Sequence, residues 1–450
     1  MKPYDILPSS RFKGRIILPG DKSIAHRAVI VSSISSGRTV IDNFPVNNDC
    51  KVSISAFHKL GFKIKRTKSD KIIVFGKGLN GLTRPKGCLF IEESGTTFRL
   101  LLGILAAQKF ETKLTAGKVL SQRPMLRVIA PLRKMGAKIT AKLSSPRNHE
   151  PANSRTRELT IEEYPPIVIK GGNLKGITYK MPVASAQVKS AILLAGLYAH
   201  GQTEIIEPVK TRDHTERMLQ LFRAKIKHKG NAIVLKGRQG LVSPGVVYIP
   251  GDISSAAFFM VAAAIVPGSS ILIKKVSLNP TRLGIIKVLK RMGMNIRLTN
   301  RELKVYEPRG DILVKSSSLK GVRILRREVP SLIDEVPILM VAASYAKGRT
   351  VFEGVGELRV KETDRIRSMS ENLKKMGADI RVVRAGKSEN IIIQGVGQLK
   401  GASLKSFGDH RTAMSAVIAG LAASGKSSID DVSCINKSLP EFLSILKSII

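Results

Sequence analysis

Tryptophan is absent from this 450-residue sequence, and aromatic residues make up only 5% of it. Proteins that bind single-stranded nucleic acid stack bases on such rings, so the composition gives that class little support. Acidic residues are also scarce, 34 against 75 lysines and arginines, which leaves a formal net charge of +41. Because the basic residues are spread along the chain without a basic tail, we interpret most of the excess as solvated surface.

Cysteine is equally scarce. Cys50, Cys88 and Cys434 lie far apart, and no Cys/His spacing suggests a zinc site or a disulfide framework. We therefore expect no metal and no cofactor. No apolar run approaches the roughly 18 residues of a membrane span, and the N-terminus lacks the apolar core of a secretory signal. These absences predict a cytoplasmic protein that does not enter a membrane.

What the sequence does contain is a repeat marked by glycine. A helix-like stretch that ends in glycine recurs as HKLGFKI, RKMGAKI, KRMGMNI and KKMGADI, with the glycines at Gly61, Gly136, Gly293 and Gly377. Each glycine is placed to end a helix in the left-handed conformation. A degenerate copy, LFRAKIKHK (221–229), falls in the wide central gap, and the chain ends in EFLSILKSII, which looks like a truncated sixth copy.

A β-branched run follows each of these caps and predicts a strand, for example KIIVFG (71–76) and NIIIQG (390–395). A glycine-rich turn follows, and we expect it to lead into a second strand. The turn GKGLNG (76–81) matches the GxGxxG pattern of dinucleotide sites. That pattern must open a helix, whereas LTRPKGCLFI comes next, so we predict a hairpin turn instead.

Each unit then enters a helix through a junction rich in Gly, Ser, Thr, Asp or Pro. The junctions are PGDKSIAHRA (19–28), EESGTTFRLL (92–101), PVASAQVKSA (182–191), PGDISSAAFF (250–259), PSLIDEVPIL (330–339) and FGDHRTAMSA (407–416). Because PGD opens the first and the fourth, six units predict two similar α/β domains of three units each, with a boundary near residue 250.

A helix N-terminus binds phosphate or carboxylate through unpaired backbone N–H groups. Cations in a first turn oppose the helix dipole, at a cost of several tenths of a kcal/mol each. Their recurrence at Lys22, Arg27, Arg99 and Arg411 therefore suggests that a bound anion offsets the cost.

PGDKSIAHRA, SGTTFRLL, PVASAQVKSAILLAGL, TRDHTERML, IDEVP, ELRVKETDRI and GDHRTAM together resemble the 5-enolpyruvylshikimate-3-phosphate synthase family over nearly the whole chain. The resemblance implies two domains of three βαβαββ repeats each, an inside-out α/β barrel with helices buried and sheets outside, and an active site in the interdomain cleft. Residues 1–20 would join 251–450 in one discontinuous domain, and 21–250 would form the other.

The activity implied is transfer of the enolpyruvyl group of phosphoenolpyruvate to the 5-hydroxyl of shikimate 3-phosphate, by a monomer. By resemblance, Lys22 contacts both substrates, Asp334 takes the hydroxyl proton and Glu362 protonates the methylene carbon. The residues implied for phosphoenolpyruvate are Lys22, Gly95, Arg123, Gln187, Arg365, Arg411 and Lys437. Those implied for shikimate 3-phosphate are Lys22, Ser23, Arg27, Ser185, Ala186, Gln187, Arg212, Asp334 and Lys361.

One residue departs from the family pattern. Glu93 stands where the family usually has asparagine beside the phosphoenolpyruvate phosphate, and a carboxylate there would repel that anion. We expect that Glu93 either turns toward a neighbouring arginine or weakens phosphoenolpyruvate binding.

Two alternatives remain open. A related transferase acts on UDP-N-acetylglucosamine and carries a cysteine on a mobile loop, whereas the comparable segment LTAGKVLSQRPM (114–125) has none and carries Arg123. The other alternative is a basic nucleic-acid-binding protein, whose affinity would fall steeply with salt.

Overall fold

Six small sheets form in the part of the chain that the computed structural model describes, residues 3–67, 70–144, 162–386 and 388–450. Contacts group Met1–Lys22, Pro45–Asn48 and Ile249–Ile450 into one compact unit, called unit 1, and Ser23–Phe44 and Asp49–Tyr248 into another, called unit 2. Each unit holds three of the sheets.

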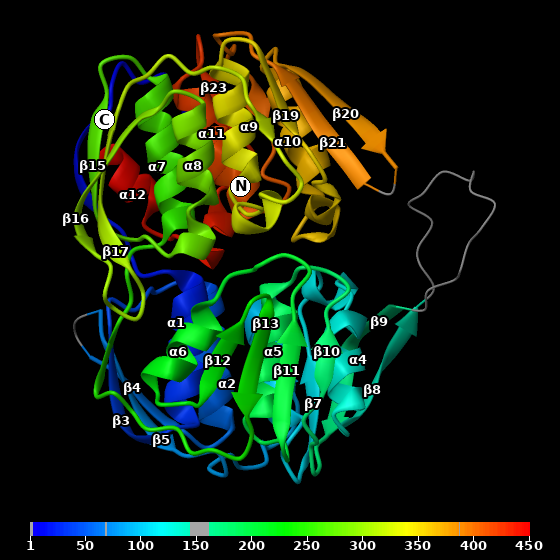
Figure 1. Ribbon diagram of the computed structural model, residues 1–450. Coiled ribbons are helices and arrows are strands. Elements are labelled where there is room, and N and C mark those ends of the chain that lie inside the picture. The colour runs from blue at the N-terminus through cyan, green and yellow to red at the C-terminus, as the bar shows by residue number, and fades with distance from the viewer. Residues whose placement is uncertain (1–2, 68–69, 145–161, 387) are drawn as a thin grey trace. The chain divides into compact units, whose positions relative to one another are not determined.

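The sheets of unit 2 have the strand orders β14-β3-β5-β4, β6-β7-β9-β8 and β10-β11-β13-β12 (Figure 1). Their strands are β3 (Ser36–Asp42), β4 (Lys63–Arg66), β5 (Ile72–Lys77), β6 (Leu89–Phe90), β7 (Glu111–Thr115), β8 (Lys138–Ser144), β9 (Glu162–Lys170), β10 (Thr178–Lys180), β11 (Gln202–Ile206), β12 (Ile226–Lys229), β13 (Ala232–Lys236) and β14 (Val246–Tyr248).

The sheets of unit 1 have the orders β16-β17-β15-β2, β18-β19-β21-β20 and β1-β23-β22. Their strands are β1 (Tyr4–Ile6), β2 (Lys13–Ile17), β15 (Ser270–Ser277), β16 (Asn295–Glu302), β17 (Arg309–Lys315), β18 (Arg323–Ile324), β19 (Arg349–Phe352), β20 (Asp379–Ala385), β21 (Ser388–Gln394), β22 (Ser403–Leu404) and β23 (Ser427–Ile429).

One pairing scheme recurs in these sheets. A parallel pair, such as β10 with β11 or β18 with β19, is followed by antiparallel pairing with the remaining strands. In the sixth sheet, β22 and β23 are parallel, and the N-terminal strand β1 pairs antiparallel with β23. The truncated sixth repeat is therefore completed by the other end of the chain.

The predicted helix starts are confirmed at all six junctions. The helices there are α1 (Lys22–Ser33), α3 (Gly95–Leu105), α5 (Ala186–Gly196), α7 (Ile253–Ile265), α9 (Val336–Tyr345) and α11 (His410–Leu421). These helices are buried along almost their whole length. In unit 1, α7 packs on β15 and β17 while α9 packs on β21, and both contact α11 (Figure 1).

A second helix follows in each repeat and buries only one face. These helices are α2 (Asn48–Lys59), α4 (Leu126–Lys134), α6 (His214–Leu221), α8 (Gly284–Arg291), α10 (Arg365–Lys375) and α12 (Phe442–Lys447). In α8, for example, Ile285, Ile286, Val288 and Leu289 are buried while the lysines face solvent. An apolar stripe at helical spacing produces this one-sided burial.

The glycine caps are confirmed as well. Gly61, Gly136, Gly293 and Gly377 all have φ between 89° and 111°, the region in which a residue with a Cβ is strained. In the degenerate copy the equivalent place is taken by Arg223, which adopts φ 67° without being glycine. The repeat geometry is thus kept there at the expense of backbone strain.

The predicted hairpin at 76–81 is wrong. β5 lies in the β14-β3-β5-β4 sheet, and the next strand, β6, lies in the β6-β7-β9-β8 sheet. The glycine-rich turn therefore carries the chain from one sheet to the next, because the following strand finds its partner in a later segment. No helix begins directly after this turn, as expected.

Within the described residues, no helix is long and apolar enough to cross a bilayer.

Candidate active site

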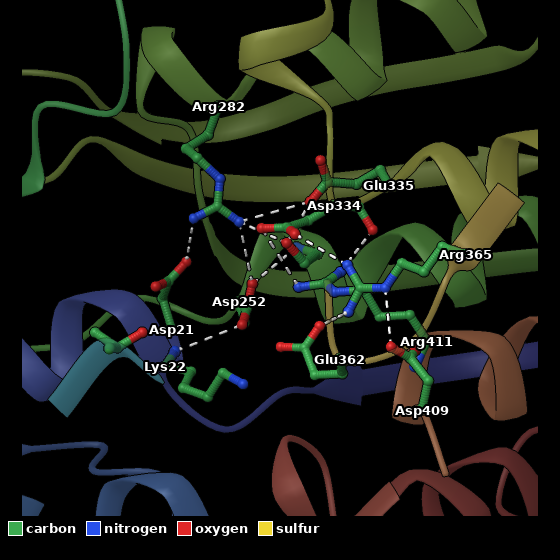
Figure 2. Close-up of polar contacts among 12 residues, drawn as sticks. Asp21, Lys22, Asp252, Arg282, Asp334, Glu335, Glu362, Arg365, Asp409 and Arg411 are labelled. Carbon is green, nitrogen blue, oxygen red and sulfur yellow. Dashed lines mark hydrogen bonds and ion pairs between the residues drawn. The ribbon is translucent and has the colours of Figure 1, made fainter. Parts of the chain in front are cut away.

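Charged side chains gather in unit 1 where several helices begin (Figure 2). The cluster comprises Asp21, Lys22, Asp252, Arg282, Asp334, Glu335, Glu362, Arg365, Asp409 and Arg411. Sequence matching assigned five of these to the site: Lys22, Asp334, Glu362, Arg365 and Arg411. The structure brings these five together within unit 1.

Arg365, the first residue of α10, is the centre of one half of the cluster. Its Nη2 donates to Glu362 Oε2 at 2.5 Å, its Nη1 to Asp334 Oδ1 at 3.3 Å, and its Nε to Asp409 Oδ2 at 3.0 Å. Burial by itself lowers the pKa of this guanidinium, but the carboxylates of Asp409, Glu362 and Asp334 raise it above its ordinary value. Arg365 is therefore a permanent cation whose planar fork is held by three partners.

Asp409 links Arg365 to a helix start. It is the N-cap of α11, and its Oδ1 accepts the backbone N–H groups of Arg411 at 2.8 Å and Thr412 at 3.0 Å. Arg411 in turn donates through Nη1 to the carbonyl of Asp334 at 2.9 Å, with its Nη2 3.8 Å from Asp334 Oδ2. The carboxylates of Asp409 and Asp334 thus offset the cost of placing Arg411 in a first turn, which the sequence had suggested a bound anion would do.

Arg282 is the centre of the other half, and sequence reasoning missed it. Its side chain is 1% exposed, and its Nη1 donates to Asp21 Oδ2 at 3.0 Å. Its Nη2 lies 3.5 Å from Asp252 Oδ1 and 3.7 Å from Glu335 Oε1. These carboxylates stand at the starts of α1, α7 and α9, and Asp21 and Glu335 are the chain neighbours of Lys22 and Asp334. Arg282 therefore ties together the helix starts that carry two proposed site residues (Figure 2).

Burial and a neighbouring carboxylate both act on the pKa of Asp252. Burial raises the pKa of this carboxyl and the neighbouring Asp21 raises it further, while Arg282 and Arg411 oppose the rise. Asp252 is the N-cap of α7, where its Oδ1 accepts the N–H of Ser254 at 2.8 Å. No sequence signal distinguished Asp252 from an ordinary cap, and a lone arginine in LNPTRLG gave no sign of its partners.

His410, the first residue of α11, lies between Asp409 and Arg411 in the chain and is buried. Burial, followed by the charges of Lys22 and Arg411, lowers the pKa of its imidazole well below the ordinary value. Among the described residues neither of its ring nitrogens has a hydrogen-bond partner. The His410 side chain is therefore a neutral group within the core of unit 1.

Two further predicted residues belong to unit 1. Lys361 ends the short helix η4 (Gly356–Val360), directly before Glu362. Lys437, the last residue of η5 (Ser433–Lys437), donates from Nζ to the carbonyl of Gly408 at 3.2 Å. Lys437 is thereby placed beside the N-cap of α11.

A second group of predicted residues lies in unit 2, around the start of α3. A Cβ added to Gly95 would stand 2.8 Å from Arg99 Nη1 and 2.9 Å from Arg123 Nη1. Two guanidinium groups therefore flank the first residue of a helix, and a side chain at Gly95 would displace them. Arg99 also donates to Gln187 Oε1 at 3.0 Å, and Gln187 Nε2 donates to Thr96 Oγ1 at 3.1 Å. This arrangement is suited to an oxyanion.

Gln187 is in the first turn of α5, next to Ala186 and the N-cap Ser185, whose Oγ accepts the N–H of Val188 at 3.4 Å. All three predicted residues of this junction are partly exposed. Arg212 is partly exposed as well, on the segment just before α6.

Arg27 is placed differently, because it is buried and bonded within unit 2. Its Nε donates to Thr215 Oγ1 at 2.7 Å, its Nη2 to Ser190 Oγ at 2.8 Å and its Nη1 to the carbonyl of Ser23 at 2.8 Å. It joins α1 to α5 and α6, and it fixes the backbone of the predicted site residue Ser23.

Among the described residues, the partners of Glu93 are backbone N–H groups and not an arginine. Its Oε1 accepts the backbone N–H of Val119 at 3.1 Å, and its Oε2 accepts that of Leu120 at 2.7 Å. Both bonds are made to the segment that leads to Arg123.

Within the described residues, no group of three or more His, Cys, Asp or Glu side chains could hold a metal ion. The cluster around Arg365 and Arg282 consists of carboxylates and cations.

Comparisons with known proteins agree with this chemistry. The family model for EPSP synthase (3-phosphoshikimate 1-carboxyvinyltransferase) matches residues 6–446. The 3-phosphoshikimate 1-carboxyvinyltransferase of Petrotoga mobilis is 45% identical over 447 residues, 99% of each chain, and that of Geotalea uraniireducens is 44% identical over 450 residues, 100% of each. A solved structure of EPSP synthase from Acinetobacter baumannii is 42% identical, with a TM-score of 0.84 over 100% of this chain and 98% of the other. The chain belongs to the EPSP synthase family.

Proposed function

We propose that the chain performs the family reaction, 3-phosphoshikimate 1-carboxyvinyl transfer, with the cluster around Arg365 as its acid–base and carboxylate-binding part. The observation that supports this most strongly is that one buried guanidinium contacts Glu362, Asp334 and Asp409 at once. A fork held in this way is oriented before substrate arrives. A substrate carboxylate can then take the place of one of its partners.

Phosphoenolpyruvate would be bound at both ends. Its carboxylate would lie on Arg365 and Arg411, with Lys437 close to the same helix start. Its phosphate would be held by Lys22, the Gly95 backbone, Arg123 and Gln187. The two guanidinium groups beside Gly95 support the phosphate assignment, because bidentate donors at a helix N-terminus are suited to phosphate.

Shikimate 3-phosphate would be bound by residues of both units. These residues are Lys22, Ser23, Arg27, Ser185, Ala186, Gln187, Arg212, Asp334 and Lys361. The contact from Arg27 to the Ser23 carbonyl supports a role for Arg27 in positioning Ser23 as well as in supplying charge.

The chemistry needs one acid and one base. Glu362 would give a proton to the methylene carbon of phosphoenolpyruvate, while the 5-hydroxyl oxygen bonds to C2 and passes its proton to Asp334. The C–O bond to phosphate then breaks in the tetrahedral ketal, and a methyl proton returns to a carboxylate as the double bond reforms. Lys22 and the arginines would stabilise the negative charge of the departing phosphate.

The finer architecture belongs to the same proposal. Residues 1–20 with 251–450 and residues 21–250 would be two domains with helices inside and sheets outside. The active site would lie in the interdomain cleft of a monomer in the cytoplasm. Substrate-dependent compaction in small-angle scattering, and a monomer mass in sedimentation, would be the expected results.

The test is phosphate release with phosphoenolpyruvate and shikimate 3-phosphate together, compared with either substrate alone and with UDP-N-acetylglucosamine as acceptor. Release is expected only with shikimate 3-phosphate. Glu362→Gln and Asp334→Asn should each lower turnover by at least about a hundredfold, the usual contribution of general acid–base catalysis. Near-normal turnover in both variants would contradict the assignment of roles. Specific nucleic-acid binding that ignores both substrates would favour the alternative class.

A further inference from the structure

Glu93 holds the backbone segment that ends at Arg123. Its two carboxylate oxygens accept the N–H groups of Val119 and Leu120, at 3.1 and 2.7 Å. These N–H groups stand at the start of the short helix η1 (Leu120–Gln122), and Arg123, its C-cap, donates its own N–H to the Leu120 carbonyl at 3.0 Å. Arg123 therefore sits at the end of a single turn whose beginning is attached to Glu93.

Gly117 makes this attachment possible. A Cβ at Gly117 would stand 2.4 Å from Glu93 Oε1 and 2.8 Å from Glu93 Cδ. The Gly117 N–H also donates to the Glu92 carbonyl at 2.6 Å. The segment thus lies close against the Glu93 carboxylate, and a side chain at Gly117 would push that carboxylate away.

The position of Arg123 needs such support. Arg123 Nη1 and Arg99 Nη1 both come within 3 Å of the Cβ position of Gly95, at 2.9 and 2.8 Å. Two guanidinium groups so near each other, and near the positive end of α3, repel one another. Charge-assisted bonds from the Glu93 carboxylate to the backbone N–H groups oppose that repulsion by fixing the segment that leads to Arg123.

We propose that Glu93 is a positioning residue for phosphoenolpyruvate binding, which acts by holding residues 117–122 so that Arg123 stays at the start of α3. The inference rests on the proposed role of Arg123 toward the substrate phosphate. An asparagine at this place would offer one carbonyl oxygen and could make only one of the two bonds. The carboxylate is directed at the backbone N–H groups of Val119 and Leu120.

The first test is the kinetics of Glu93→Ala and Glu93→Gln. The alanine variant loses both bonds, so its KM for phosphoenolpyruvate should rise about tenfold, the equivalent of one good hydrogen bond. Glu93→Gln keeps one acceptor and should show a smaller rise. The dissociation constant of shikimate 3-phosphate should not change in either. Glu111→Ala, which removes an exposed carboxylate on β7, is the control for net charge.

A double-mutant cycle separates positioning from a general structural effect. In an Arg123→Ala background, Glu93→Ala should change the KM for phosphoenolpyruvate less than about twofold, because its effect passes through Arg123. Gly117→Ala should raise the KM in the parent enzyme by pushing the carboxylate away, yet add little when Glu93 is already alanine. Gly117→Ala keeps the test decisive if Glu93→Ala does not fold.

Several results would overturn the inference. An unchanged or lowered KM in Glu93→Ala would mean that the carboxylate does not support the anion site. A tenfold effect that persists without Arg123 would mean that Glu93 acts by another route. If the parent enzyme is active and either of these two results is obtained, only the positioning role of Glu93 is contradicted. If the parent releases no phosphate from the substrate pair, the proposed function falls and the inference with it.

Discussion

Glu362 and Asp334 are hydrogen-bonded to the same guanidinium, that of Arg365, at 2.5 and 3.3 Å. The two carboxylates proposed as acid and base are therefore oriented by one buried cation. A residue that contacts both can change the geometry of both steps of the reaction.

Arg365→Lys should lower kcat/KM for phosphoenolpyruvate by at least about a hundredfold, because an ammonium cannot reach three carboxylates in the planar arrangement of a guanidinium. Phosphate-release kinetics would measure the effect. The exposed pair of Arg367 with Glu371 offers a control, since Arg367→Lys should leave kinetics almost unchanged. Equal activity of both variants would show that the fork of Arg365 is dispensable.

Arg282→Met should lower the free energy of unfolding by about 3–5 kcal/mol, because it leaves buried carboxylates without their cation. Urea denaturation would measure the loss. The matched control is Arg323→Met, which removes an arginine whose side chain is 71% exposed and paired with Glu353. A surface pair of that kind contributes less than about 1 kcal/mol. A loss of similar size in the two variants would contradict the structural role of Arg282.

His410 should make the protein less stable in mild acid. Its folded pKa lies well below the ordinary value, so the unfolded chain binds the proton first as the pH falls. The contribution to stability is complete above the unfolded pKa of about 6.5 and is lost as the pH falls toward the folded pKa.

The measurement is urea unfolding of the parent and of His410→Gln between about pH 7 and pH 5. The fall in unfolding free energy should be smaller in the variant, which cannot titrate at this position. Parallel pH profiles for the two proteins would count against a depressed pKa.

Arg223→Gly should raise the free energy of unfolding by up to about 1 kcal/mol, because it removes left-handed strain that costs about 1–2 kcal/mol and adds some chain entropy to the unfolded state. The opposite change at an equivalent cap, Gly377→Arg, should destabilise the protein. Thermal unfolding of both variants would check the pair. If Arg223→Gly did not stabilise the protein, Arg223 would have to make contacts that compensate for its backbone strain.

The local signals in the sequence were sufficient for the secondary structure of the repeats. Glycine caps such as Gly61 and Gly293 act over a few residues, and so do the junctions that begin α1, α3, α5, α7, α9 and α11. Capping and apolar periodicity are properties of the neighbouring chain. The motifs around Lys22, Arg365 and Arg411 likewise indicated the family and the kind of chemistry.

Only the tertiary structure decided which partners these residues have. Arg282 meets Asp21 from a distant part of the chain, β5 and β6 separate into different sheets, and Glu93 binds backbone N–H groups instead of an arginine. A short stretch of sequence specifies where a helix begins, but an ion pair forms only where packing brings two such beginnings together. The sequence therefore predicted the six helix starts, but it did not predict which carboxylates bind Arg282 and Arg365.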